Sequence, residues 1–395
     1  MLDLTALPDN FYDNPYPHYA ELRDNMPICP QPDGSFLLSR HADLDMIYRD
    51  TTRFISDKKA VFAPKYGDNS PLYEHHTTSL VFNDPPLHSR VRRALTGAMT
   101  PRAMARMEPD LTALVDSLLD ALADSEEVDL IETFAGAIPV EVIGNLLDIP
   151  RQQRGPLRDW SLAILGALEP KLSEEQLAVG NTAVEEFKAF LACIVADRTQ
   201  HPGDPETDVL TRLIQAEGGI LSEVELLQNC IFILNAGHET TTNLIGNALW
   251  LLDQHRDVRN RLLAEPRLIG TAVDEFLRLE SPNQFGNRLT TESIEISGVR
   301  IPKGADLHLC IGAANRDRAT FHHPDQLLPD RHPNRHLAFA AGPHTCIGLT
   351  LARMEGRIAI DRFLKRHPDY VITENMERSR RVRFRGFTKL QARLS

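Results

Sequence analysis

The longest regular pattern in the sequence is a helix that we expect to run from Ser222 to about Gln254. Ser222 and Glu225 stand three residues apart before an apolar run. This is the spacing of a capping box, in which each side chain bonds the backbone of the other residue. Further helical patterns cover Pro109 to Ala123 and Ser173 to Thr199. Helices therefore dominate the middle of the chain.

Strand patterns appear only after Pro282. Ser293 to Ser297, Gly298 and Val299 to Pro302 predict a hairpin, and Leu307 to Ile311 predicts another strand. The chain is then irregular as far as Gly342, and a last long helix follows. No repeat, low-complexity tract or Gly/Ser linker marks a boundary. We expect a mainly α fold, a helical bundle with small β-sheets, in a single domain over residues 1–395.

Composition excludes several classes of function. Acidic residues outnumber basic ones by 55 to 43, which argues against nucleic acid as a partner because such binding needs a basic footprint. No apolar run approaches the ~18 residues that span a bilayer, and the first ten residues do not resemble a signal peptide. We therefore expect a cytoplasmic protein without a membrane anchor. The five cysteines are spread singly, which argues against a disulfide framework.

The most informative segment surrounds one cysteine and reads Phe339-Ala340-Ala341-Gly342-Pro343-His344-Thr345-Cys346-Ile347-Gly348. A single cysteine is usually a small buried hydrophobe. Cys346, however, begins an amphipathic helix (Leu349 to Lys365), where free N–H groups and the helix dipole stabilise a thiolate. Gly342 and Gly348 allow a tight turn and the close approach of a flat ligand. A thiolate ligand suits iron that must cleave O–O bonds.

A His-rich metal site is the competing interpretation of this region. Its ligands would come from His322, His323, His332, His336 and His344. Their spacings fit no regular zinc pattern, so most of these histidines are more simply loop or surface residues.

The long helix contains Ala236-Gly237-His238-Glu239-Thr240-Thr241-Thr242, which is locally unfavourable for a helix. Close packing of another helix on small residues would explain it. Alternatively, the Thr240 hydroxyl bonds back to the Ala236 carbonyl and loosens the helix. That would open a groove for a diatomic ligand, with the carboxyl of Glu239 and the hydroxyl of Thr240 beside it.

Two charged elements have ordinary explanations when each is considered alone. Glu275 and Arg278 are three apart on one helix face, which usually makes a weak surface ion pair. The run from Asp84 to Arg93 is usually a solvated face. His88 and Arg92 in it are four apart and therefore share a face of a helix.

Together, and in this order, these four elements resemble the bacterial soluble cytochrome P-450 family of haem-thiolate monooxygenases, from about Phe11 to the C-terminus. The Phe-x-x-Gly-x-His-x-Cys-x-Gly spacing is similar to the family's haem-binding loop, although Ala340 stands where the family usually has glycine. The resemblance implies the single-domain cytochrome P-450 fold. It also implies haem b (iron protoporphyrin IX) with Cys346 as the axial ligand of the iron.

The resemblance assigns roles to further residues. Glu239 and Thr240 would relay the two protons that reductive O₂ activation requires. Glu275 and Arg278 would form a buried structural group with Arg331. The haem propionates would bind His88, Arg92, Arg288 and His344, and a docking patch for an acidic ferredoxin would include Arg90, Arg93, Arg353 and Arg357.

The implied reaction is insertion of one oxygen atom from O₂ into a small organic substrate. Only about fifty residues follow Cys346, so we expect no fused redox module and electron delivery by a separate ferredoxin and ferredoxin reductase. A peroxide-driven peroxygenase is a rival, but it would not need the pair of Glu239 and Thr240. Two further hypotheses are a non-catalytic haem sensor and a helical interaction protein without cofactor.

The substrate pocket is predicted from the order of segments along the chain. The segment Val61 to Phe82 is one candidate, although it could be an ordinary surface loop. Asn235 and Gln284 favour a substrate with a polar group if they face the cavity. The single residues expected to line the pocket are Phe232, Asn235, Ala236, Gln284, Phe285 and Phe387.

Overall fold

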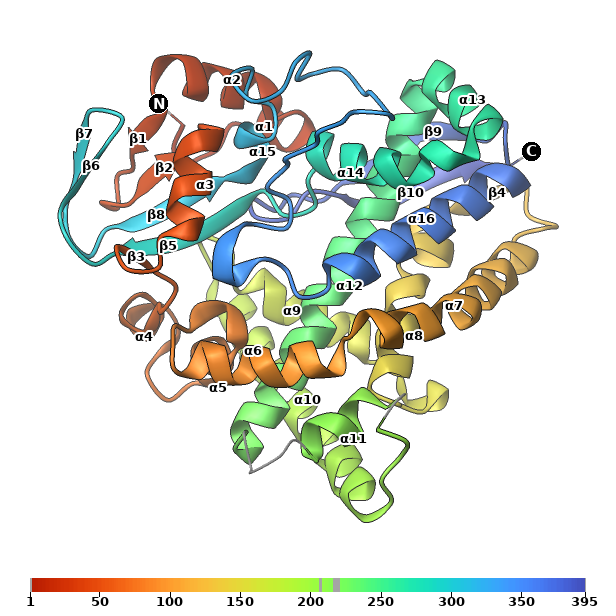
Figure 1. The fold of residues 1–395 in the computed structure, drawn as a ribbon, viewed down its shortest axis with the longest axis horizontal. Helices are drawn as coiled ribbons and strands as arrows, with labels where there is room; N and C mark the ends of the chain where they lie inside the picture. The colour runs from red at the N-terminus through yellow and green to blue at the C-terminus, as the bar shows by residue number, and fades with distance from the viewer. Residues whose placement is uncertain (1, 206–207, 216–220, 395) are drawn as a thin grey trace. The chain divides into compact units, whose positions relative to one another are not determined.

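The computed structural model describes residues 2–205, 208–215 and 221–394 (Figure 1). The chain folds as two compact units. Unit 1 comprises Met1–Ile55, Leu111–Ala137 and Thr240–Ser395, and unit 2 comprises Ser56–Asp110 and Ile138–Glu239. The single domain expected over residues 1–395 stays a prediction.

Every strand assigned within the described residues belongs to unit 1. A five-stranded sheet has the order β1-β2-β8-β5-β3, in which only β2 and β8 pair in parallel. Two smaller antiparallel sheets have the orders β4-β10-β9 and β6-β7. The strands are β1 (Ile28–Pro30), β2 (Phe36–Leu38), β3 (Phe54–Ile55), β4 (Glu127–Asp129), β5 (Phe285–Thr290), β6 (Ile294–Ile296), β7 (Val299–Ile301), β8 (Asp306–Cys310), β9 (Val371–Arg378) and β10 (Phe387–Arg393).

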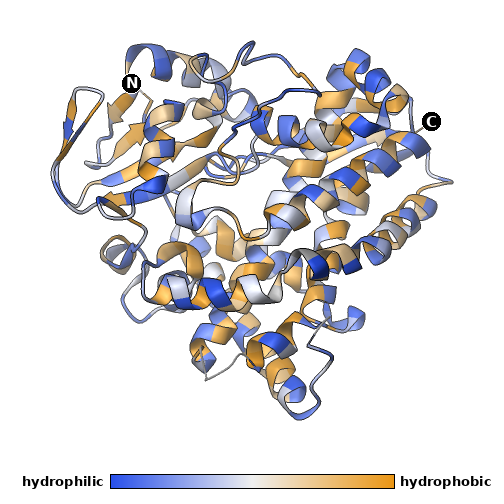
Figure 2. Cartoon of the chain, viewed as in Figure 1, coloured by the Kyte–Doolittle hydropathy of each residue, from blue (hydrophilic) through white to orange (hydrophobic). Residues whose placement is uncertain are grey.

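Helices are the other regular elements of unit 1, and two of its apolar clusters pack on the five-stranded sheet. Hydrophobic and hydrophilic residues alternate around α16, as expected for a helix with one buried side (Figure 2). The helices are α1 (Asp9–Asp13), α2 (Tyr16–Asn25), α3 (His41–Arg49), η2 (Ile131–Ala135), α13 (Arg256–Ala264), η4 (Pro266–Leu268), α14 (Ile269–Leu279), α15 (Ile311–Ala314), η5 (Gly342–His344) and α16 (Leu349–Arg366).

Unit 2 consists of helices and their connections within the described residues. Three helices are divided between the units in sequence: α7 (Pro101–Ala121), α8 (Ala137–Leu146) and α12 (Glu223–Gln254). The others are α4 (Lys59–Tyr66), α5 (Pro71–Thr78), η1 (Leu80–Phe82), α6 (Leu87–Ala98), η3 (Arg151–Gln153), α9 (Leu157–Gly166), α10 (Glu174–Gln200) and α11 (Val209–Ile214).

The structure confirms the locally encoded elements. The Ser222 amide donates to the Glu225 carboxylate at 2.8 Å, and the Glu225 amide donates to the Ser222 hydroxyl at 3.3 Å, which is the predicted capping box. The hairpin also forms as predicted, with Gly298 at φ 79° in its turn. The predicted start of α7 at Pro109 is wrong, because the helix begins at Pro101 and continues through that proline.

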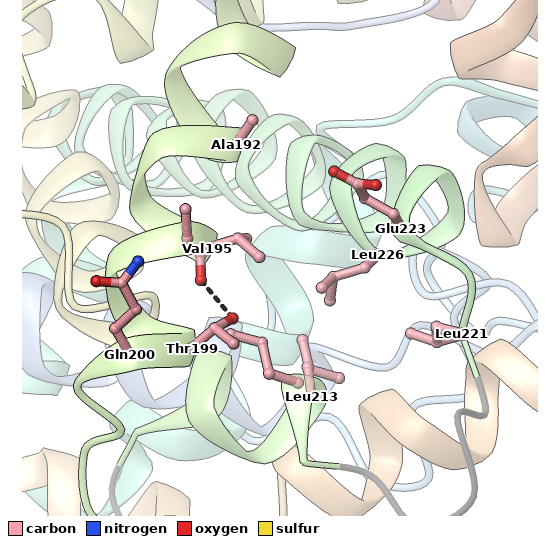
Figure 3. A pocket seen from close by; sticks show the side chains of 10 residues that line it. Ala192, Val195, Thr199, Gln200, Leu213, Leu221, Glu223 and Leu226 are labelled. Atoms are coloured by element: carbon pink, nitrogen blue, oxygen red, sulfur yellow. Dashed lines mark hydrogen bonds between the residues drawn. The ribbon is translucent and has the colours of Figure 1, made fainter.

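A hollow of about 450 Å³ opens in unit 2 between α10, α11 and the start of α12 (Figure 3). Its walls are mainly aliphatic, and Thr199 within it donates a hydrogen bond to the Val195 carbonyl. None of the predicted site residues lines it. No helix in the described part of the chain is both long and apolar enough to cross a membrane.

Candidate functional site

Cys346 lies in unit 1 between η5 and α16, and its side chain is exposed. Its amide donates to the Phe339 carbonyl at 2.9 Å, and the Thr345 hydroxyl donates to the Gly342 carbonyl at 2.7 Å. These bonds fix the turn that holds the sulfur two residues before Gly348, the N-cap of α16. An anionic ligand atom is favoured at this end of a helix.

The turn requires unusual backbone conformations. Ala340 has φ 55° and Gly342 has φ 68°, both in the left-handed region. A Cβ atom at Gly342 would also clash with the backbone of Tyr48 in α3. Glycine at 342 therefore permits both the turn and the close approach of α3, whereas Ala340 adopts a conformation that favours glycine.

Replacing Ala340 with glycine should raise the free energy of unfolding by about 1 kcal/mol, because the left-handed conformation penalises an L side chain. Chemical denaturation measures the change. Ala341→Gly is a matched control, since Ala341 is extended at φ −147° and buried, so glycine there should destabilise the protein. Equal effects of the two substitutions would contradict the argument.

Arg288 brings a buried cation near the cysteine turn. It projects from β5, is 5% exposed, and its guanidinium carbon lies 5.1 Å from the centre of the Tyr48 ring. Tyr48 contacts the turn through Gly342 and contacts β5 through Gly286, where a Cβ atom would clash with the tyrosine hydroxyl. His344 is half-buried in η5. Arg288, His344 and Cys346 thus belong to neighbouring segments of unit 1.

The other two predicted propionate ligands belong to unit 2. His88 is buried and Arg92 is half-buried on α6, where their spacing of four places them on one face. Arg90 points elsewhere and pairs with Glu225.

Glu239 and Thr240 occupy consecutive positions on α12, with Glu239 buried and Thr240 half-buried. α12 is one continuous helix through Gly237. Packing accounts for the glycine, because a Cβ atom at Gly237 would clash with the side chain of Ile143 in α8. Burial lowers the pKa of the neighbouring His238 to about 4, so its imidazole is neutral at pH 7.

The sequence alone did not mark Glu355 as a site residue. It lies on the apolar face of α16 with Leu351 and Ile358. It is 2% exposed. Burial raises the pKa of its carboxyl to about 8, and a hydrogen bond with Thr241 opposes the shift. Thr241 follows Thr240 directly, so a protonated carboxylic acid lies beside this part of α12.

Glu355→Gln should reduce the pH dependence of folding stability. Between the unfolded pKa of 4.5 and the folded pKa of about 8, the folded chain holds the extra proton. The contribution of Glu355 to the free energy of unfolding is therefore fully present below about pH 4.5 and is lost as the pH rises through 8. The loss amounts to up to about 4–5 kcal/mol. Urea unfolding at about pH 5 and pH 8 should show a smaller difference for the variant. The exposed Glu374→Gln should behave like the unaltered protein, and an unchanged pH difference in Glu355→Gln would refute this origin.

Glu275, Arg278 and Arg331 meet in the interior of unit 1. Arg278 Nε lies 2.8 Å and Arg331 Nε lies 2.9 Å from the Glu275 carboxylate, and the Glu275 and Arg278 side chains are fully buried. Asn334 and the Leu328 amide also donate to the same carboxylate, at 3.1 and 3.0 Å. The sequence alone did not identify Asn334 as a partner of Glu275. One carboxylate thus ties α14 to the irregular segment before Cys346.

The histidines of the alternative metal site are dispersed. His336 bonds to Asp274 at 3.2 Å, whereas the rings of His322 and His323 contact each other, with their centres 3.8 Å apart and their planes inclined by 58°. Among the described residues, no group of three or more His, Cys, Asp or Glu is placed to hold a metal ion.

The predicted pocket residues come from both units. Asn235 is buried on α12 and accepts a hydrogen bond from Ser161 of α9; Phe232 and Ala236 are half-buried on the same helix. Phe285 packs instead in a core cluster with Tyr19, and strand alternation turns it away from the face of Arg288.

Gln284 and Phe387 also pack within unit 1. The Gln284 amide donates to the Ser281 carbonyl at 2.7 Å, and its oxygen lies against Gly312. The ring of Phe387 lies 6.0 Å from that of Trp250, which is ten residues, or about 15 Å of helix, from Thr240. The assignment of Phe285, Gln284 and Phe387 to the pocket stays a prediction.

Comparisons with known proteins agree with this geometry. The sequence model of the family described as Cytochrome P450 matches residues 170–379. A relative from Bacillus subtilis (strain 168), "Biotin biosynthesis cytochrome P450", is 34% identical over 365 residues, covering 91% of this chain and 90% of that protein. The chain belongs to the cytochrome P450 family. The predicted fold class and reaction class are thereby confirmed.

Other cytochrome P450s show a similar extent of likeness. "Vitamin D(3) 25-hydroxylase" from Pseudonocardia autotrophica is 34% identical, covering 93% of this chain and 90% of that protein. The crystal structure of P450BioI in complex with an acyl carrier protein carrying hexadec-9Z-enoic acid superposes with a TM-score of 0.93 at 32% identity, covering 98% of this chain and all of that chain.

As a cytochrome P450, the protein is a haem-thiolate monooxygenase that uses O₂ and electrons from redox partners to oxidise a small organic substrate. Residues of unit 1 fit a haem group. The exposed sulfur of Cys346 lies just before α16, and the cysteine turn packs against Tyr48, which the buried cation of Arg288 contacts. Of the arginines expected to dock a cytochrome P450 redox partner, Arg353 pairs with Asp274 at 2.8 Å and Arg90 pairs with Glu225.

Proposed function

We propose that Cys346 is the axial thiolate ligand of a haem b iron and that His88, Arg92, Arg288 and His344 bind its propionates. The observation that best supports this proposal is the exposed sulfur of Cys346 just before α16. Its turn packs on Tyr48, and Arg288 contacts the same tyrosine. Haem b is supported because the five cysteines stand singly, so the chain has no C-x-x-C-H motif for covalent haem attachment. When bound, such a haem supplies O₂ activation assisted by electron donation from the thiolate.

We further propose that Glu239 and Thr240 deliver protons to the reacting oxygen. A carboxyl and a hydroxyl at consecutive positions of α12 can pass a proton between them and exchange it with water. Glu239 is 5% exposed, so its contact with bulk solvent is small and proton delivery would depend on the pair of Glu239 and Thr240. The same segment also provides Phe232, Asn235 and Ala236 as the proposed lining of the substrate pocket.

A ferredoxin with its ferredoxin reductase is the proposed electron source. An acidic carrier suits exposed arginines, and Arg93 on α6 is exposed. Arg357 on α16 is a further proposed contact, together with Arg90 and Arg353, which also pair with Glu225 and Asp274. A cytoplasmic location is proposed with this partner, because the reductant that feeds such carriers is generated there.

Glu239→Gln and Thr240→Val should each uncouple electron use from product formation. Without the relay, we expect product formation to fall about 100-fold, at the low end for general acid catalysis. Electrons should continue to reduce O₂, but to hydrogen peroxide. Product, peroxide and consumed reductant are measured together with a ferredoxin chain.

The control is turnover driven by added peroxide, which already supplies both oxygens and should be affected much less than turnover with O₂. Unchanged coupling in both variants would refute the relay. Wild-type turnover with peroxide far above that with O₂ would favour a peroxygenase.

A further inference from the structure

An asparagine on α12 has only half of its amide satisfied. Asn235 is 2% exposed, and its Oδ1 accepts a hydrogen bond from the Ser161 hydroxyl at 2.8 Å. Ser161 is itself 1% exposed on α9. Both residues belong to unit 2. The bond fixes the amide with its oxygen toward α9.

The other end of this amide is a buried donor. Asn235 Nδ2 has no hydrogen-bond partner among the described residues. Buried polar groups are nearly always bonded, and an unsatisfied donor costs free energy that leucine at the same position would not. Asn235 therefore weakens the contact between α9 and α12 unless something outside the chain accepts the hydrogen bond.

A second asparagine on the same helix shows the contrast. Asn229 is 1% exposed; its Oδ1 accepts from the Leu80 amide at 2.9 Å and its Nδ2 donates to the Glu225 carbonyl at 2.8 Å. Both ends of that amide are bonded within the chain, so Asn229 has a structural explanation. In Asn235 only the oxygen is bonded within the described part of the chain, so a structural role does not account for its Nδ2 donor.

The position of Asn235 points to substrate. It precedes Glu239 by four residues, which places the two side chains on one face of α12, about 6 Å apart along the helix axis. Glu239 is the group proposed to supply protons at the reacting oxygen. A ligand that reaches this site therefore extends along the turn of α12 that carries Asn235.

We propose that Asn235, oriented by Ser161, is a specificity-determining residue that donates a hydrogen bond to an oxygen of the substrate. The preferred substrates are therefore apolar molecules with a carbonyl, carboxyl or hydroxyl oxygen about one helical turn from the carbon that is oxidised. This inference rests on the proposed role of Glu239. It also gives a positioning role to Ser161, a residue that the sequence alone did not identify.

The test measures binding to the holoenzyme with three probes of equal chain length: dodecane, 2-dodecanone and dodecanoic acid. Equilibrium dialysis gives the ratio of the Kd for dodecane to the Kd for each oxygenated probe. Asn235→Leu should lower at least one ratio 5- to 10-fold, as expected for one lost hydrogen bond. A fall for the ketone indicates a neutral acceptor, and a fall for the acid alone indicates a carboxylate. Ser161→Ala should lower the same ratio by less, because the amide can then rotate.

Thermal unfolding of the ligand-free holoenzyme separates this role from a structural one. Asn235→Leu should keep or raise the Tm, whereas Asn229→Leu should lower it. Ratios that do not change in Asn235→Leu, including failure of both oxygenated probes to bind, would overturn the proposal. So would a loss of Tm equal to that of Asn229→Leu. Because binding is measured without reductant, failure of the proton relay would appear in the coupling assay and leave this result intact.

Discussion

Replacing Cys346 with serine should abolish the long-wavelength Soret band that a thiolate-ligated ferrous haem gives with carbon monoxide. A serine hydroxyl has nearly the shape of the thiol but does not supply the anionic sulfur that donates electron density to iron. Turnover should fall at least about 1,000-fold, equivalent to about 4 kcal/mol of transition-state stabilisation. Because the side chain is exposed and the turn is fixed by backbone bonds, the variant should still fold.

Cys193→Ser is the matched control, since Cys193 is also exposed but lies on α10. It should retain both the absorption band and the turnover. Haem content should be measured for both variants, because the proposed propionate ligands remain in each. An unchanged carbonyl spectrum in Cys346→Ser would remove the ligand assignment and every role that depends on it.

Features that depend on nearby residues were predictable from the sequence. The capping box of Ser222 and Glu225, the hairpin at Gly298 and the helix after Cys346 each follow from residues within a few positions of one another. The start of α7 was missed because Pro109 is a strong local signal for a helix start. The surrounding helix nevertheless continues through it.

Partners distant in the sequence were much harder to predict. The pattern around Asn235 gives no sign that Ser161, on another helix, bonds its oxygen, nor does Glu275 indicate that Asn334 shares its carboxylate. Phe285 was expected in the pocket from the order of segments along the chain, but the sequence did not show that its side chain joins the core cluster around Tyr19. Arg331 was predictable as a partner of Glu275 only through the family resemblance.

Glu275→Gln should lower the free energy of unfolding by about 3–5 kcal/mol. The glutamine keeps the size of the side chain but leaves the guanidinium of Arg278, which is fully buried, without its counter-charge. A loss of this size is a large part of the 5–15 kcal/mol typical of a folded domain. Since Arg331 and Asn334 are anchored to the same carboxylate, the segment that leads to Cys346 should loosen, and haem content should fall. Denaturant unfolding and the ratio of haem to protein measure the two effects.

Glu265→Gln provides the contrast that isolates burial. Glu265 also contacts two arginines, with Arg261 at 3.3 Å and Arg267 at 2.5 Å, but its side chain is 35% exposed and those of the arginines are 41% and 78% exposed. Solvent screens such pairs, so this substitution should cost less than about 1 kcal/mol and leave haem content unchanged. Similar losses in the two variants would mean that the number of arginines, and not the removal of water around Glu275, sets the energy of the cluster.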